Sequence, residues 1–269
     1  MSLILPSVLT IAGSDSSGGA GIQADLKTIE ALGLYGSSVI TTLTAQNTTK
    51  VYLTETVSQD MLCSQLDAVF SDIMPQAIKI GMVGNVSSIQ IITKTLTRYN
   101  QIPTVLDPVM VSTSGCSLLK SSAVTELTAK LFPLVTLITP NLPEAEVLLS
   151  TKSGLISTHS QMEEAVWDLS KKYGSSFLLK GGHSKQGASD VLCHQGKVTW
   201  FPSEPVPTIN THGTGCTLSS AIACGLAKGL NLEESIKIAK EYLTGALRAD
   251  LNMGKGNGPL WHGYKSFSG

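Results

Sequence analysis

Gly13-Ser-Asp-Ser-Ser-Gly-Gly-Ala-Gly-Ile-Gln-Ala-Asp25 is the stretch of this chain that decides the fold. It follows a short apolar run, Val8–Ala12, and opens a segment of helical periodicity, Ile22–Leu32. A strand, a glycine-rich turn and a helix in this order form the first part of a βαβ unit. The stretch therefore predicts an α/β protein built around parallel strands.

The same alternation continues along the chain. Strands are expected over Val8–Ala12, Val39–Leu43, Ala77–Gly81, Val105–Asp107, Leu134–Thr139 and Phe177–Lys180. Helices are expected over Ile22–Leu32, Met61–Phe70, Val86–Tyr99, Ala123–Leu131, Pro143–Leu149 and Gln161–Lys172. Because the strands are short and almost wholly apolar, both faces of the sheet should be covered. We predict a doubly wound, mostly parallel central sheet with helices on both faces.

The pattern changes in the last third of the chain. Asp190–His194 and Val198–Pro202 predict a hairpin around a three-residue turn that contains Gly196. Helices should follow over Cys216–Lys228 and Leu232–Leu251, and Asn231 fits the N-cap of the second. We find no linker or internal repeat and expect one domain over residues 1–269.

Composition points to small-molecule partners. Hydrophobic residues make up 42% of the chain, charged residues 14%, and the formal net charge is −1, so neither a nucleic-acid groove nor a membrane-surface helix is expected. The start of the chain lacks the basic residues of a signal peptide, and no long apolar stretch follows. Five cysteines without a C-x-x-C pair suggest neither a disulfide framework nor a structural zinc site. We expect a cytoplasmic protein.

Polar residues gather where the predicted strands end. Gln46, Asp107 and Asn141 each follow a strand. Ligands of doubly wound sheets bind at the carboxyl ends of the strands, so one crevice could collect these side chains.

A second glycine-rich stretch, Thr211-His212-Gly213-Thr214-Gly215-Cys216, precedes an apolar helix. Its glycines would let backbone N–H groups turn toward an anion at the positive end of the helix, with the thiol of Cys216 beside it. Phosphoryl transfer needs such donors, because its transition state spreads negative charge. The alternative is a plain glycine turn before a buried helix.

Two common nucleotide-binding classes are disfavoured. Gly19–Ala24 matches G-x-G-x-x-A, but no Asp or Glu occurs from Ala31 to Thr54, where a dinucleotide site needs an acidic residue. No glycine-lysine pair is followed by Ser or Thr, so a Walker A loop is absent.

The motifs together are similar to those of the hydroxymethylpyrimidine/phosphomethylpyrimidine kinases of thiamine biosynthesis, within the ribokinase-like superfamily. The resemblance runs nearly end to end through Gly13–Thr28, Thr44–Thr48, Lys79–Met82, Leu106–Met110, Ile138–Ala145, Lys180–His183, Thr211–Thr217 and Gly254–Pro259.

The resemblance implies a role for each matching position. The pyrimidine would contact Gly13, Asp25, Gln46, Met82 and Val109. Phosphoryl transfer would involve Gly213, Gly215, Cys216 and Lys180, and ATP would also contact Asn141, Thr211 and Thr214. Mg²⁺ would be held by Glu144 and Asp107. ATP and Mg²⁺ are the implied cofactors, and a homodimer is the implied assembly.

Cys216 stands where most of the superfamily places an aspartate base. A helix N-terminus lowers the pKa of a thiol, so a thiolate could accept the hydroxymethyl proton. Alignment and charge neutralisation by Mg²⁺, Lys180 and the loop amides should contribute more than a base, so whether Cys216 acts as one is left open. His183 and His212 are expected to shape the phosphate site.

The rival activities are a pyridoxal kinase, which also phosphorylates a hydroxymethyl group on a flat nitrogen ring, and a non-catalytic vitamin-binding sensor. Gln46 favours the pyrimidine, since an amide can donate to and accept from its edge. Retention of Glu144, Lys180 and Cys216 argues against a sensor.

Overall fold

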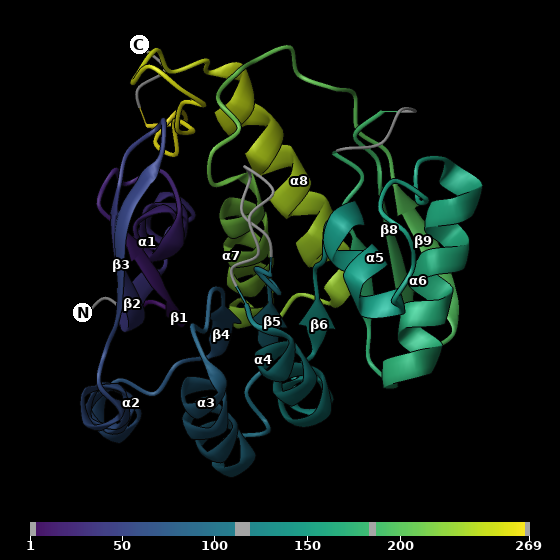
Figure 1. Ribbon diagram of the computed structural model, residues 1–269. Helices are drawn as coiled ribbons and strands as arrows, with labels where there is room; N and C mark the ends of the chain where they lie inside the picture. Colours follow the sequence, from purple (N-terminus) through teal and green to yellow (C-terminus); the bar gives the residue numbers. More distant parts are fainter. Residues whose placement is uncertain (1–3, 111–118, 183–186, 267–269) are drawn as a thin grey trace.

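The computed structural model describes residues 4–110, 119–182 and 187–266. Within these residues the chain forms a nine-stranded sheet in the order β3-β2-β1-β4-β5-β6-β7-β8-β9 (Figure 1). The strands are β1 (Ser7–Asp15), β2 (Tyr35–Gln46), β3 (Val51–Thr56), β4 (Ala77–Ile80), β5 (Thr104–Leu106), β6 (Leu137–Ile138), β7 (Phe177–Leu179), β8 (Asp190–His194) and β9 (Lys197–Phe201). Strands β1, β2 and β4 to β7 pair in parallel, whereas β3, β8 and β9 pair antiparallel at the two edges.

Helices cover both faces of the sheet, as the alternation predicted. They are α1 (Gly21–Ala31), α2 (Gln59–Asp72), α3 (Val86–Arg98), α4 (Ser121–Glu126), α5 (Leu142–Leu149), α6 (His159–Tyr173), α7 (Thr214–Ala227) and α8 (Leu232–Arg248). Successive strand residues point to opposite faces. Ile78 therefore packs in the core beneath α2 to α6, while its neighbour Ala77 packs in the core beneath α1, α7 and α8. Both cores are fully buried, which explains the absence of polar alternation in the central strands.

Every predicted strand and helix exists, but most boundaries shift: β1 and β2 run several residues beyond the predicted Val8–Ala12 and Val39–Leu43. The strand expected over Leu134–Thr139 shrinks to Leu137–Ile138, and the helix expected over Ala123–Leu131 passes into a π turn and a short 3-10 turn. Pro133 lies in that 3-10 turn and lacks an N–H to continue the helix. The last helix ends at Arg248, before Asp250 takes a φ of 43°.

One strand was not expected from the sequence. β3 has no buried residue, so its side chains show no apolar alternation. It pairs antiparallel with the end of β2 and forms an edge of the sheet. Tertiary pairing therefore creates a strand that hydrophobic periodicity does not mark.

The strand order fixes where a ligand can bind. The chain leaves β1 toward β2 on one side, whereas β4 lies on the other side of β1. This reversal is a topological switch point, and a crevice is expected at the carboxyl ends of β1 and β4. Among the residues that the structure covers, no helix has the length and apolar character of a membrane span.

Candidate active site

Glycines, which have no side chain, let three backbone segments approach one another at the switch point. A Cβ on Gly13 would overlap the terminal methyl group of Met82, and a Cβ on Gly21 would overlap the carbonyl oxygen of Gly13. Gly21 also has a φ of 57°, which favours glycine. The end of β1, the start of α1 and the residues after β4 thus form one closely packed wall.

The second glycine stretch lies against the first. Gly213 has a φ of 86°, and a Cβ there would overlap the carbonyl oxygen of Gly19. Helix α7 begins directly afterwards at Thr214 and has no side-chain cap at its N-terminus. Thr211, which is exposed, accepts a hydrogen bond from the N–H of Thr214 at 3.3 Å. The positive end of α7 therefore has no side-chain acceptor for its first N–H groups.

Charged side chains face this helix end. The Lys180 ammonium donates to Oδ1 of Asp107 at 2.6 Å. A Cβ on Gly215 would lie 3.0 Å from Oδ2 of Asp107 and 3.1 Å from Nζ of Lys180. Burial lowers the pKa of Lys180, but Asp107 and Glu144 together raise it, so this side chain is a cation. Backbone donors and a fixed positive charge thus converge at Gly215, as an anion site requires.

Glu144 and Asn141 hold each other at the start of α5. The Asn141 side chain accepts from the N–H of Glu144 at 2.9 Å, and Oε2 of Glu144 accepts from the N–H of Asn141 at 2.8 Å. These two contacts form a capping box. The other carboxylate oxygen of Glu144, Oε1, accepts from the N–H of Met110 at 3.5 Å. Burial raises the pKa of Glu144 to about 7, against the lowering effect of Lys180. These contacts stabilise the start of α5.

Cys216 lies where the N-termini of α1 and α7 meet, with the backbone N–H of Gly21 directed at its sulfur. The sequence predicted a lowered thiol pKa, and this is wrong. Desolvation raises the pKa of Cys216 to about 11, outweighing the charge of Lys79 and the N–H of Gly21. The carboxylates of Asp25 and Asp107 raise it further. The isolated protein therefore holds a neutral thiol at neutral pH.

Asp25 has a different environment from the one the sequence suggested. It is fully buried, and its carboxylate accepts from Thr10 at 2.6 Å and from Ser220 at 2.7 Å. Nζ of Lys79 donates to both oxygens at 2.8 Å. Asp25 thus has no exposed surface to offer a ligand and instead ties α1, β1, β4 and α7 together beneath the crevice. No role for Lys79 was predicted, although it lies in the Lys79–Met82 motif.

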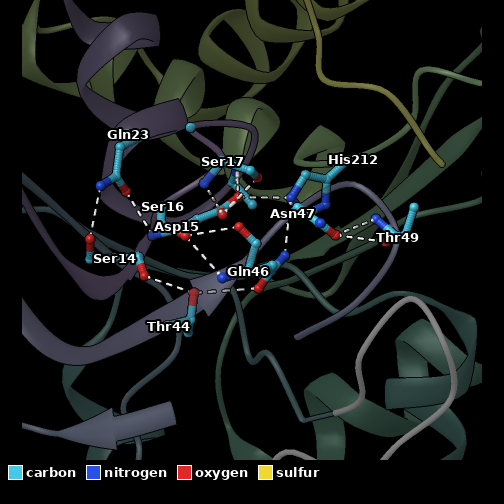
Figure 2. A network of polar contacts seen from close by, with 12 residues as sticks. Ser14, Asp15, Ser16, Ser17, Gln23, Thr44, Gln46, Asn47, Thr49 and His212 are labelled. Atoms are coloured by element: carbon cyan, nitrogen blue, oxygen red, sulfur yellow. Dashed lines mark hydrogen bonds and ion pairs between the residues drawn. The ribbon is translucent and has the colours of Figure 1, made fainter. Parts of the chain in front are cut away.

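The other end of the site is formed by the polar side chains of Gln46 and Thr44, together with Asp15 and His212 (Figure 2). Gln46, at the end of β2, is half-buried and lies 3.3 Å from Nε2 of His212. The same His212 nitrogen lies 2.8 Å from Oδ2 of Asp15. His212 was expected to shape the phosphate site, whereas its ring points to this network. Asp15 was overlooked as a functional residue, although its place in the polar stretch after the predicted strand Val8–Ala12 was a usable signal.

Met82 and Val109 are half-buried apolar residues after β4 and β5. Met82 packs over Gly13, and the N–H of Val109 donates to the carbonyl oxygen of Asp107 at 2.9 Å. Val109 thereby adjoins the charged group at Gly215. His183 lies outside the described residues.

Known proteins are similar to this chain in sequence and in fold. The family model for phosphomethylpyrimidine kinase matches residues 15–261. A Rhizobium meliloti hydroxymethylpyrimidine/phosphomethylpyrimidine kinase is 47% identical over 94% of this chain and 96% of its own length. The Geobacter sulfurreducens thiamine biosynthesis bifunctional protein ThiED is 48% identical over 95% of this chain, which spans only 52% of that protein. An ADP complex of Bacillus subtilis pyridoxal kinase superposes with a TM-score of 0.89 at 34% identity, covering 98% of this chain and 100% of the other.

Proposed function

The chain belongs to the phosphomethylpyrimidine kinase family, and from this membership we propose that it transfers the γ-phosphoryl group of ATP to 4-amino-5-hydroxymethyl-2-methylpyrimidine. A second transfer to the resulting monophosphate would yield the pyrophosphate used for thiamine. Both transfers would take place in one catalytic domain. The observation that carries the proposal is the uncapped start of α7, where Gly215 faces Lys180 and Asp107.

The phosphate end works through charge. The N–H groups of Gly213–Cys216 and the Lys180 ammonium would bind the transferring phosphoryl group and stabilise its negative charge. Thr211 and Thr214 flank the start of α7 in the chain, and Asn141 forms a β-bridge with Lys180, so these residues would border the rest of the nucleotide. Because these groups are held by packed backbone, they need little rearrangement when charge develops.

A magnesium ion fits one carboxylate better than the other. In the part of the chain that the structure covers, no three His, Cys, Asp or Glu side chains are grouped to hold a metal alone. Mg²⁺ at phosphate sites uses one or two carboxylates with phosphate oxygens and water, so such a group is not required. Asp107, with Oδ2 beside Gly215, fits this role, whereas both oxygens of Glu144 already accept backbone hydrogen bonds. When bound, the ion would neutralise phosphate charge.

The acceptor end works through shape and hydrogen bonds. Met82 and Val109 would supply apolar walls for the flat ring. The terminal methyl group of Met82 occupies the space that a side chain at Gly13 would need. Gln46 would bind the polar edge of the pyrimidine. Cys216 lies between the two ends, where its neutral thiol would border the reacting hydroxyl group.

A parallel assay of ADP release tests the proposed substrate. The pyrimidine alcohol, its monophosphate and pyridoxal would each be supplied with MgATP. We expect turnover of both pyrimidines, with pyridoxal at most a side substrate. Turnover of pyridoxal alone would overturn the substrate, and binding without ADP release would support a sensor.

We also propose a cytoplasmic homodimer. Strands β3 and β2 form an apolar ribbon on one face of this edge, where Leu53 and Leu43 are 66% and 48% exposed. A second copy of the chain would cover this apolar ribbon, which is unusual on a free sheet edge. Sedimentation should show a dimer for the native protein and a monomer for Leu53→Lys; a native monomer would contradict the proposal.

A further inference from the structure

At the acceptor end, each of two contacts of the Gln46 amide conflicts with another contact of the same neighbour (Figure 2). Nε2 of the Gln46 amide faces Nε2 of His212 at 3.3 Å. Oε1 of Gln46 faces the Thr44 hydroxyl group at 3.5 Å. An amide nitrogen can only donate and its oxygen can only accept, so each contact constrains the orientation of the amide.

Asp15 decides where the proton on His212 lies. Its Oδ1 accepts from the N–H and hydroxyl group of Ser17, at 2.9 and 2.7 Å, and its Oδ2 accepts from the N–H of Ala20 at 2.9 Å. Burial raises the pKa of Asp15, but the hydrogen bonds from His212, Ser17 and Ala20 lower it to about 2. A carboxylate at 2.8 Å requires a hydrogen on Nε2 of His212. Nε2 is then a donor and cannot also accept from the Gln46 amide nitrogen.

Thr44 gives the same answer independently. Its hydroxyl group donates to the carbonyl oxygen of Ser14 at 3.0 Å. The single hydroxyl proton is thereby used, so Thr44 can only accept from Gln46. Rotating the Gln46 amide by half a turn satisfies both neighbours at once: its oxygen then accepts from His212, and its nitrogen donates to Thr44.

We propose that Asp15 and His212 are a positioning pair that fixes the orientation of the Gln46 amide and so sets its preference for an aminopyrimidine edge. With one lone pair given to His212 and one N–H given to Thr44, Gln46 retains one acceptor and one donor. These match an exocyclic amino group and the adjacent ring nitrogen in one order only. The proposal rests on the proposed role of Gln46 in binding the acceptor.

The first test measures the tautomer in the intact protein. Nitrogen-15 NMR of histidine-labelled protein, with His212 assigned by its loss in His212→Phe, should show a protonated Nε2. In Asp15→Asn the new amide can donate to His212, so Nε2 should lose its proton. An unprotonated Nε2 in the native protein would overturn the proposal.

The second test separates the acceptor from ATP. Asp15→Asn should raise the KM for the pyrimidine alcohol about tenfold, the usual cost of one reversed hydrogen bond. The KM for ATP and the kcat/KM for pyridoxal, which lacks the amino group, should change by less than about twofold. Equal losses for pyridoxal and the pyrimidine would indicate a structural defect and refute the pair.

Matched variants keep the outcome interpretable. Ser17→Ala removes a hydrogen bond to Oδ1 of Asp15 but leaves the contact of Oδ2 with His212, so the ratio of the two acceptors should stay constant. If Asp15→Asn does not fold, His212→Phe keeps a flat ring at this position without its N–H donor and should show the same selective rise in KM. An unchanged KM in Gln46→Ala would remove the proposed role of Gln46, and the positioning pair with it. A raised KM in Gln46→Ala with no change in Asp15→Asn would refute the pair alone.

Discussion

The phosphate end and the acceptor end of the crevice use different kinds of group. At the phosphate end, backbone N–H groups of the α7 N-terminus lie beside the Lys180–Asp107 pair. At the acceptor end, the neutral side chains of Gln46 and Thr44 are oriented by the Asp15–His212 contact. Charge binds any phosphoryl group, whereas ordered donors and acceptors distinguish one ring from another.

This difference has a kinetic consequence. Substitutions at the phosphate end should slow transfer to every acceptor by the same factor. Substitutions at the acceptor end should change the ratio between acceptors. His212 faces the acceptor end and is followed directly by Gly213 of the phosphate end, so the two ends of the site are adjacent in the chain.

Gly215→Asp should have the largest effect. Its Cβ would lie 3.0 Å from Oδ2 of Asp107, so a carboxylate there would fill the anion site and repel Asp107. We expect kcat/KM for ATP to fall by at least about a thousandfold, with equal losses for both pyrimidine acceptors. Gly215→Ala adds the carbon without the charge and should lose less. Near-native activity in a folded Gly215→Asp protein would remove the phosphate end from its proposed place.

Lys180→Met should have the next largest effect, because it removes the charge and leaves Asp107 without its ionic partner. Side chains in this pair are 14% and 4% exposed. We expect kcat to fall about a hundredfold and unfolding free energy by about 3 kcal/mol. Steady-state kinetics and urea unfolding measure the two losses. Asp107→Leu combined with Lys180→Met should recover stability but not activity; recovery of both would contradict a role in catalysis.

Cys216→Ala should cost less than either. The pKa of its thiol is raised to about 11, so little thiolate is present at neutral pH. We expect kcat to fall about tenfold or less, below the usual contribution of a general base. The pH profile provides the check: if the thiolate were the base in the native protein, activity would rise steadily toward alkaline pH and Cys216→Ala would abolish that rise.

The sequence predicted the sheet well because central strands are buried on both faces. Ile78 and Ala77 need no polar alternation to be recognised as a strand. β3 was not predicted because Val51–Thr56 has no buried face, and its pairing with β2 is a tertiary contact. The local sequence pattern thus predicts the buried central strands but not the exposed edge strand.

The sequence predicted the location of the candidate site better than the chemistry of its side chains. Glycines mark close approach, and Gly13, Gly213 and Gly215 do allow it. The predicted direction of the Cys216 pKa shift was wrong, because desolvation and the nearby carboxylates depend on packing that no motif displays. The contacts of Asp25 with Lys79 and Ser220 join residues far apart in the chain, so its burial was equally hidden.

Glu144→Gln should have the smallest effect and concerns stability at the phosphate end. The pKa of Glu144 is about 7 in the folded chain and nearer 4.5 when unfolded, so folding holds its proton more tightly. The native protein should therefore lose stability as pH rises between these values, and the glutamine variant should not. Between pH 4.5 and pH 8 the difference in unfolding free energy should shift by about 1 to 3 kcal/mol in favour of the variant. Urea unfolding at both pH values measures it, and Glu234→Gln, at the same capping-box position of α8 but exposed, is the matched control. Parallel pH dependences for Glu144→Gln and the native protein would mean that the carboxylate is solvated, and that the phosphate end is less dry than its packing indicates.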